Sequence, residues 1–333
     1  MKERDAIAAL ISAFRRSPAQ RNKPFAADAE IVDLGGSLWA ITVDDYSAED
    51  RWDTADPFTL GWNLVAATMS DLLAVGAAPR FMLNSFIATA RMDEGWLRML
   101  SRGMDEALGA CGAHMLGGDV GMGAEWRFTG VALGGFPAGS RPLSRVADAR
   151  AGRVIVSGTF GDANLAASNG APAPRLEIRV PESRRLAAAI RGAGGACIDT
   201  SDGLVAALEA FCLCDPSLRI EIDRAAVPYA TGIDAAARAL GLPREIFLMG
   251  SAGEYELVAL AGATADATER DSPGPAHGLR AIGRFAHAGD PGIHFRQGDD
   301  LRAHAGLPDP RAAGSLEEYR TALITLARKV FGG

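Results

Sequence analysis

Lysine is almost absent from this sequence, which has only Lys2, Lys23 and Lys329 among its 34 basic residues. A composition biased toward Ala, Gly and Arg accounts for the shortage itself. The phosphate-binding pattern GxxxxGK[ST] is also missing, and this excludes a nucleotide site of the P-loop type. If the protein handles phosphates, arginines and metal ions must therefore neutralise them.

Cysteine is scarce as well, and the four residues at 111, 197, 212 and 214 form no CxxC pair. A zinc site and a disulfide framework are therefore not indicated, and a reducing, cytoplasmic compartment is expected. The chain lacks an apolar run of about 18 residues and a signal-peptide pattern, which predicts no membrane partner. A net charge of −7 with scattered arginines argues against a nucleic-acid partner.

The pattern of strands and helices predicts a two-domain protein of the α/β (or α+β) class. The chain has 333 residues, of which 48% are hydrophobic, so it can bury a sizeable core. We expect strands at 38–46, 81–89, 113–119 and 126–136, helices at 56–79 and 93–112, and a similar mixture in the second half, including two strand-like runs within 245–262. Because residues 137–152 are rich in loop formers, we expect domains at 1–138 and 150–333.

Several aspartates stand in apolar, glycine-flanked surroundings. Asp44 ends the strand "AITVD", Asp71 lies on a helix that is apolar on most sides, and Asp119 follows two glycines in "HMLGGDV". Asp28 in "FAADAEI" and Asp202 in "DTSDGL" are similar, and Asp162 is a sixth acid of this type. One such acid would be read as a capping or ion-paired residue. Because a buried charge is costly without a partner, five of them favour a shared cation site over separate structural roles.

The identity of the cation follows from the donor atoms. With no cluster of Cys or His, zinc and copper fit poorly, whereas carboxylate oxygens suit Mg²⁺. Mg²⁺ is commonly held by a few carboxylates together with water and substrate phosphates. The sequence therefore predicts metal-bridged nucleotide phosphates, a chemistry of positioning and charge neutralisation.

The order of short motifs along the chain resembles thiamine-monophosphate kinase. The motifs are "VDLGGSLWAITVD", "SDLLAVGAAP", "MLGGDV", "VSGTFGDA", "IDTSDGL", "RIEIDR" and "GEYEL". More broadly, the chain resembles the superfamily of aminoimidazole-ribonucleotide synthetase (PurM-like), selenophosphate synthetase and the hydrogenase maturation factor HypE. The resemblance implies an N-terminal domain that contributes strands to a dimer barrel, hence a homodimer, and a C-terminal α/β domain, with ATP and Mg²⁺ in the cleft between them.

The resemblance also implies roles for individual residues. Metal-binding positions are matched by Asp28, Asp44, Asp71, Asp119 and Asp202, of which Asp202 is also the expected catalytic residue. ATP-binding positions are matched by Gly117, Gly118, Asp119, Arg145 and Ser201, and substrate-binding positions by Tyr255 and Glu256.

The chain departs from the kinase pattern at three places near the expected site. GDDAAV is "AADAEI" here, TTDMLVEGVHF is "TVDDYSAEDRW", and GGEDYEL is "SAGEYEL", with Gly253 in place of an acid. The acceptor can therefore be thiamine monophosphate or another small phosphorylated heterocycle. Two further interpretations stay open: an ATP-dependent synthetase of the aminoimidazole-ribonucleotide synthetase type, and a non-catalytic nucleotide-binding homologue.

Overall fold

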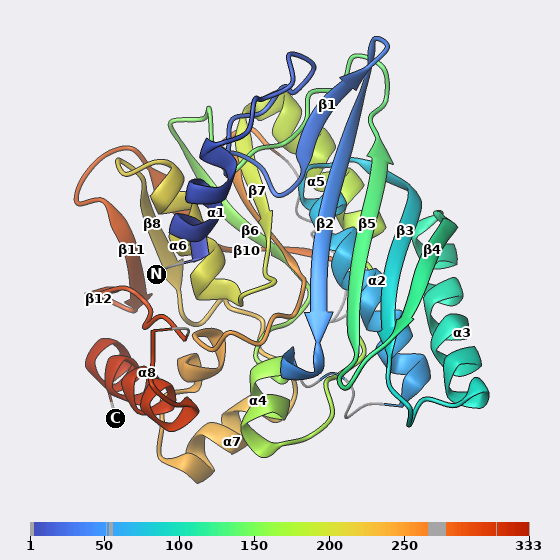
Figure 1. Ribbon diagram of the computed structural model, residues 1–333. Coiled ribbons are helices and arrows are strands. Elements are labelled where there is room, and N and C mark those ends of the chain that lie inside the picture. The colour runs from blue at the N-terminus through green and yellow to red at the C-terminus, as the bar shows by residue number, and fades with distance from the viewer. Residues whose placement is uncertain (1–2, 51, 53–55, 266–277, 311, 333) are drawn as a thin grey trace.

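The computed structural model describes residues 3–50, 52, 56–265, 278–310 and 312–332. Two β-sheets lie beside each other, one built from residues 30–135 and the other from residues 151–303 (Figure 1). Helices accompany both sheets, which confirms the expected α/β class. No helix in these residues is both long enough and apolar enough to cross a bilayer.

The first sheet has the strand order β1-β2-β5-β3-β4. All its neighbours are antiparallel except β3 and β4, which run parallel. Helices α2 and α3 follow β2 and β3 in the chain and pack against the sheet (Figure 1). The elements of this half are α1 (Glu3–Ser12), β1 (Glu30–Leu34), β2 (Ser37–Ser47), the 3₁₀ turn η1 (Ala48–Asp50), α2 (Pro57–Ala74), β3 (Ala78–Ala88), α3 (Glu94–Cys111), β4 (His114–Met122) and β5 (Arg127–Gly135).

The second sheet has the order β12-β11-β8-β10-β6-β9-β7, so that β7 lies at one edge. Its elements are β6 (Ala151–Ser157), α4 (Asp162–Asn169), α5 (Val180–Ala193), β7 (Gly195–Asp199), α6 (Leu204–Cys214), β8 (Arg219–Asp223), α7 (Ile233–Leu240), the 3₁₀ helix η3 (Arg244–Leu248), β9 (Leu257–Gly262), β10 (Leu279–Ala286), β11 (Gly292–Gln297), β12 (Asp300–Ala303) and α8 (Leu316–Phe331).

Helix α2 connects the two halves. It begins where the sequence predicts, because the Asp56 side chain caps it by accepting from the amides of Phe58 and Thr59. Most of its residues belong to the core of the first half. Its last turn, with Leu73 and Ala74, packs instead into a cluster with α5 and the second sheet. A side chain on this helix can therefore reach the junction of both halves.

The chain differs from the sequence-based expectation in several elements. Strand β4 runs to Met122, three residues beyond the expected end at Asp119, with a bulge opposite Leu83. Residues 244–248 form a 3₁₀ helix where a strand was expected, because Phe247 and Leu248 pack into the core as a turn. The short strands β1, β11 and β12 carry too weak an alternation to be predicted.

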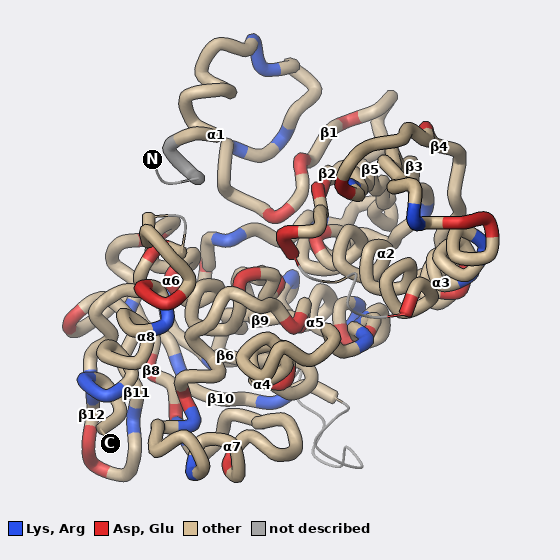
Figure 2. Tube along the Cα trace, turned by 60° about the horizontal axis from the view of Figure 1, so that its bottom comes forward, with Lys and Arg blue, Asp and Glu red and all other residues tan. Residues whose placement is uncertain are grey.

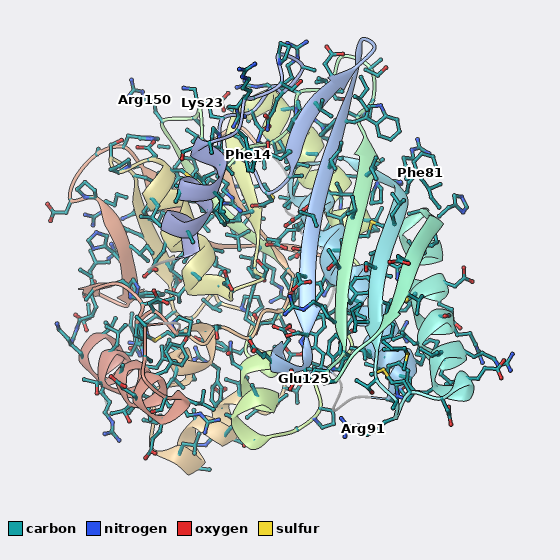
Figure 3. All side chains as sticks on the ribbon, viewed as in Figure 1. Phe14, Lys23, Phe81, Arg91, Glu125 and Arg150 are labelled. Atoms are coloured by element: carbon teal, nitrogen blue, oxygen red, sulfur yellow. The ribbon has the colours of Figure 1, made fainter. Side chains whose placement is uncertain are left out.

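The outer face of the first sheet, on the side away from α2, presents apolar side chains to solvent. Val43 on β2 is 63% exposed and Leu83 on β3 is 39% exposed, and both are in register with Val131 of β5, so they share this face. Phe81 of β3, labelled in Figure 3, stacks on Trp39 of β2. Phe14, beyond α1, is a separate exposed apolar residue (Figure 3). Isolated exposed apolar residues are ordinary, but several on one sheet face indicate a surface that another molecule covers.

Helices α2 and α3 approach each other closely because glycines stand at their contact. A Cβ atom at Gly103 would lie 1.9 Å from the carbonyl oxygen of Phe58, and one at Gly61 would lie 2.1 Å from that of Leu100. Neither position has room for a side chain, because the obstructing atoms are backbone.

We predict that Gly103→Ala lowers the free energy of unfolding by about 1–3 kcal/mol, because the added methyl forces the two helices apart. Gly109→Ala on the same helix is the matched control, since a Cβ there meets no atom within 4 Å. It should leave stability unchanged or raise it by about 0.5–1 kcal/mol. Urea denaturation measures both, and equal effects of the two substitutions would contradict the close approach.

Candidate functional site

Four carboxylates from four separate segments meet where the two halves join. Asp28 precedes β1, Asp44 lies on β2, Asp71 on α2, and Asp199 at the end of β7. The Asp28 side chain is fully buried, and Asp199 is 4% exposed. Figure 2 shows acidic segments of the first half next to the second half at this junction. We call these four residues the carboxylate cluster.

Burial raises the pKa of every carboxyl group in the cluster, and repulsion by neighbouring carboxylates adds to this at Asp28, Asp44 and Asp71. Loss of solvation is the main cause at Asp28, whose pKa rises to about 6, with Arg145 opposing the rise. It is also the main cause at Asp44, whose pKa rises to about 7. The pKa of Asp71 rises well above its usual range and that of Asp199 rises too. The cluster therefore needs positive charge nearby to stay ionised at neutral pH.

Arg145 supplies part of that charge. Its Nε donates to Oδ1 of Asp28 over 2.6 Å, and its Nη2 lies 2.5 Å from the same oxygen. The other oxygen of Asp28 accepts from the backbone amide of Asp199 over 3.2 Å, so Asp28 joins the two halves. Thr42 Oγ1 donates to Asp71 Oδ2 over 2.5 Å. One guanidinium faces four carboxyl groups, which leaves a deficit of positive charge.

A bound cation fits this deficit. Oδ2 of Asp199 is buried and has no hydrogen-bond partner among the described residues, and such an atom is costly unless a ligand satisfies it. Within those residues no three His, Cys, Asp or Glu side chains are already arranged as a metal cage. Mg²⁺ bound here would therefore need water and substrate phosphates among its ligands, which is its usual mode of binding. The all-oxygen donor set fits the same ion.

Beside the carboxylate cluster, a pocket of about 740 Å³ opens between the two halves of the chain. Asp44 is a member of the cluster and also lines this pocket. The end of β2, the turn η1 and Trp52 form one wall. The turn after β7, with Ser201 and Asp202, and residues 251–253 form another wall, and Tyr255 lines the pocket next to Trp52. A polar pocket between two domains is a common place for a small-molecule site.

The segment between α4 and α5 closes a third side of the pocket and is tied to α2. Asn63 Nδ2 donates to the carbonyl of Pro174 over 2.9 Å, and Asn63 Oδ1 accepts from the amide of Leu176 over 2.9 Å. Trp62 Nε1 donates to the carbonyl of Leu176 over 2.8 Å. We call these three bonds the α2 clasp. They fix residues 174–176 of the second half against the first.

The other residues that the sequence analysis predicts for the site lie outside the carboxylate cluster, some at the pocket and one away from it. Asp202 is exposed at the pocket wall, three residues beyond Asp199. Ser201 donates its backbone amide to Oδ1 of Asp199 over 3.3 Å. Tyr255 lines the pocket. Glu256 is held away from it in a buried ion pair with Arg179, at 2.6 Å, and lines a smaller hollow of about 180 Å³. The roles assigned to these residues stay predictions.

Asp119 is on β4, an edge strand, where its backbone pairs with Ser85 and its side chain is exposed. The structure does not bring it into the carboxylate cluster within one chain. The two glycines before it have a local reason: a Cβ at Gly118 would lie 2.2 Å from Oδ1 of Asn84. Gly117, with φ of 154°, lies at the bulge. The nucleotide and metal roles of Gly117, Gly118 and Asp119 also stay predictions.

Asp199 is the residue that the sequence analysis missed. The motif "IDTSDGL" holds two acids, and we chose the second. The signal was present, because Asp199 directly follows the apolar residues of "ACID" at the end of a strand, as Asp44 does in "AITVD".

Comparison with known proteins identifies the relatives of this chain. Residues 26–135 match the family model "AIR synthase related protein, N-terminal domain". The thiamine-monophosphate kinase of Methanopyrus kandleri is 31% identical over 216 residues, which is 60% of this chain and 65% of that enzyme. The chain thus spans slightly less than two thirds of that relative. The thiamine-monophosphate kinase of Mycobacterium tuberculosis H37Rv is 29% identical over 318 residues, covering 91% of each protein.

Solved structures share the fold at lower identity. The complex of AaThiL with AMPPCP and TMP has a TM-score of 0.71 at 19% identity and covers 89% of this chain and 93% of that one. Escherichia coli HypE, a hydrogenase maturation protein, has a TM-score of 0.64 at 22% identity, covering 93% and 99%. At these identities the likeness concerns the fold alone.

We predict that Mg²⁺ stabilises the protein and that Asp71→Asn weakens this effect. At a Mg²⁺ concentration 100-fold above its Kd, the wild type should gain about 2.7 kcal/mol. The variant removes one of the crowded charges, so it should be at least as stable as the wild type without Mg²⁺ and gain less when Mg²⁺ is added. Thermal unfolding with and without MgCl₂ measures this. Asp105→Asn, on the exposed side of α3, is the control that should keep the full gain. An undiminished gain in Asp71→Asn would exclude the residue from the metal site.

Proposed function

We propose that this chain, a thiamine-monophosphate-kinase-like protein of the AIR synthase-related (PurM-like) superfamily, transfers the γ-phosphoryl group of ATP to thiamine monophosphate. The products would be thiamine diphosphate and ADP. The observation that carries the proposal is the carboxylate cluster beside a pocket of about 740 Å³. Similarity along 91% of a curated thiamine-monophosphate kinase supports the choice of acceptor.

The cluster supports this reaction because phosphoryl transfer depends on position and on neutralised charge. Asp28, Asp44, Asp71 and Asp199 would hold Mg²⁺ together with the phosphates of ATP. When bound, the ion would offset the negative charge of the two phosphate groups that must approach each other. Asp119 and Asp202 are proposed as further ligands, on the resemblance alone.

The protein's own residues would keep the carboxylate oxygens in place. Arg145 holds Asp28, Thr42 holds Asp71, and the Ser201 amide holds Asp199, each through a hydrogen bond. These bonds fix the orientation of the ligands before ATP arrives, so less order has to be created on binding. Ser201 and Arg145 also stand at the positions that the resemblance assigns to ATP.

A phosphate acceptor reduces the need for a general base. The second ionisation of a phosphate monoester has a pKa of about 6, so its attacking oxygen is already anionic at neutral pH. We therefore propose that Asp202, exposed at the pocket wall, helps to position the metal or the acceptor and does not remove a proton.

The test is a steady-state assay of thiamine diphosphate formation from thiamine monophosphate and Mg-ATP. We expect a kcat/KM of about 10⁴ M⁻¹s⁻¹ or more, an ordinary value for enzymes, and a loss of at least 100-fold in Asp71→Asn. ATP turnover with another phosphorylated heterocycle only would indicate a relative with a changed acceptor. Turnover with an amide or carbonyl acceptor would favour the synthetase, and ATP binding without any turnover would favour the non-catalytic homologue.

We also propose that the protein is a homodimer that buries the outer face of the first sheet. The exposed apolar residues Val43 and Leu83, together with the stacked Trp39 and Phe81, support this partner surface. Light scattering at micromolar concentration should give the mass of two chains, and Val43→Glu should shift it toward one chain. A wild type with the mass of one chain, 34.8 kDa, would overturn the proposal.

A further inference from the structure

Three aromatic residues form one wall of the pocket. Trp52 stacks on Tyr46 with ring centroids 4.8 Å apart and planes at 19°, and it meets Tyr255 edge to face at 5.8 Å. Tyr46 is 7% exposed and packs on Phe128 in the core, whereas Trp52 is partly exposed. One face of the indole is thus supported by Tyr46, and Trp52 borders the pocket.

Tyr255 is held in this wall by its backbone. Its φ is 55°, a left-handed conformation that a tyrosine rarely adopts, and such strain persists only where the surroundings enforce it. The neighbours of Tyr255 do so: Glu256 donates its amide to Thr200 Oγ1, and the Glu254 side chain accepts from the amide of Gly161. Burial is the main cause of a raised pKa at both Tyr255 and Tyr46, and the two tyrosines also interact electrostatically.

Gly253 explains why the wall opposite Trp52 carries no large side chain. A Cβ there would lie 2.0 Å from the carbonyl oxygen of Ser201 and 2.6 Å from that of Thr200. These are backbone atoms, so the acid that the kinase pattern places at this position cannot be accommodated. Residues 251–253 offer only the small side chains of Ser251 and Ala252 and main-chain groups to the pocket. Discrimination between acceptor rings therefore falls to the opposite wall.

The charges around the pocket are of one sign. Its described lining includes Asp45, Glu49 and Asp50 besides the proposed metal ligands Asp44 and Asp202, and within that lining there is no Lys, Arg or His. Of these acids, Asp45 is paired with Arg127 outside the lining, at 3.2 Å. An aromatic face beside carboxylates favours a flat ring that is cationic or rich in N–H donors, and disfavours an anionic ring.

We propose that Trp52 is the residue on which the acceptor ring stacks, and that this wall selects flat, positively charged heteroaromatic rings. The inference rests on the proposed function, in which the acceptor occupies this pocket. The thiazolium ring of thiamine monophosphate has the required charge and shape. Trp52 acts by binding the ring, so its loss should weaken acceptor binding and leave the carboxylate cluster intact.

The test compares Trp52→Ala, Trp52→Phe and the control Trp96→Phe, whose indole packs on Phe86 away from the pocket. With Mg-ATP and thiamine monophosphate, Trp52→Ala should raise the KM for the acceptor about 10-fold, the effect of losing one aromatic contact. The kcat and the KM for ATP should stay within about 2-fold, because 2-fold is only about 0.4 kcal/mol. Trp52→Phe should restore most of the affinity, and Trp96→Phe should match the wild type. An unchanged acceptor KM in Trp52→Ala would overturn the proposal.

Calorimetric binding separates this inference from the proposed function. Thiamine monophosphate should bind the wild type more tightly than Trp52→Ala even if no product forms, in which case the kinase proposal fails and the ring site stands. The neutral analogue 3-deazathiamine monophosphate, with a thiophene ring, should bind about 10-fold more weakly, as expected for one lost charge contact. Equal binding of the two compounds would overturn selection by charge, and no binding of either would overturn the ring site.

Discussion

The repulsion among four carboxyl groups that share one arginine is the constraint on which the other features depend. Asp28, Asp44, Asp71 and Asp199 come from four segments, and Arg145 pairs directly with only the first. Burying that much negative charge is unfavourable unless a cation completes the site. The fold therefore keeps a region whose negative charge is not fully compensated by the protein. A bound metal ion would compensate it, whereas the groups of a protein core compensate one another.

Helix α2 carries much of this arrangement. It brings Asp71 to the junction and contacts the second sheet through its last turn. Through the α2 clasp it also holds residues 174–176, which close the third side of the pocket. Its near-complete burial makes a charged residue on it unusual, and that is what made Asp71 conspicuous in the sequence. The glycines at the contact with α3 fix the position of α2 relative to its neighbour.

Features with local causes could be predicted from the sequence, and those set by tertiary packing could not. The start of α2, the class of fold and the placement of Asp44 and Asp71 follow from capping, alternation and apolar surroundings. Asp199 and Asp202 look alike in "IDTSDGL", and only the packing of β7 against α2 decides which one turns inward. The exposure of Asp119 depends on β4 being an edge strand, which no short pattern reveals. In the sequence, Gly253 appears only as the loss of an acid from the kinase pattern. The structure shows that the nearby carbonyl of Ser201 leaves no room for a side chain at this position.

The α2 clasp has a consequence for how this protein can change over generations. Each of its three bonds joins a side chain of α2 to a main-chain atom of Pro174 or Leu176, so these bonds do not depend on which side chains the segment carries. Ala171 and Ala173, just before this segment, line the pocket and lie outside the buried core, unlike Leu176. Substitutions among them can alter the shape and polarity of the wall while the backbone keeps its path. New acceptor preferences can therefore arise here by single mutations, without first losing the fold.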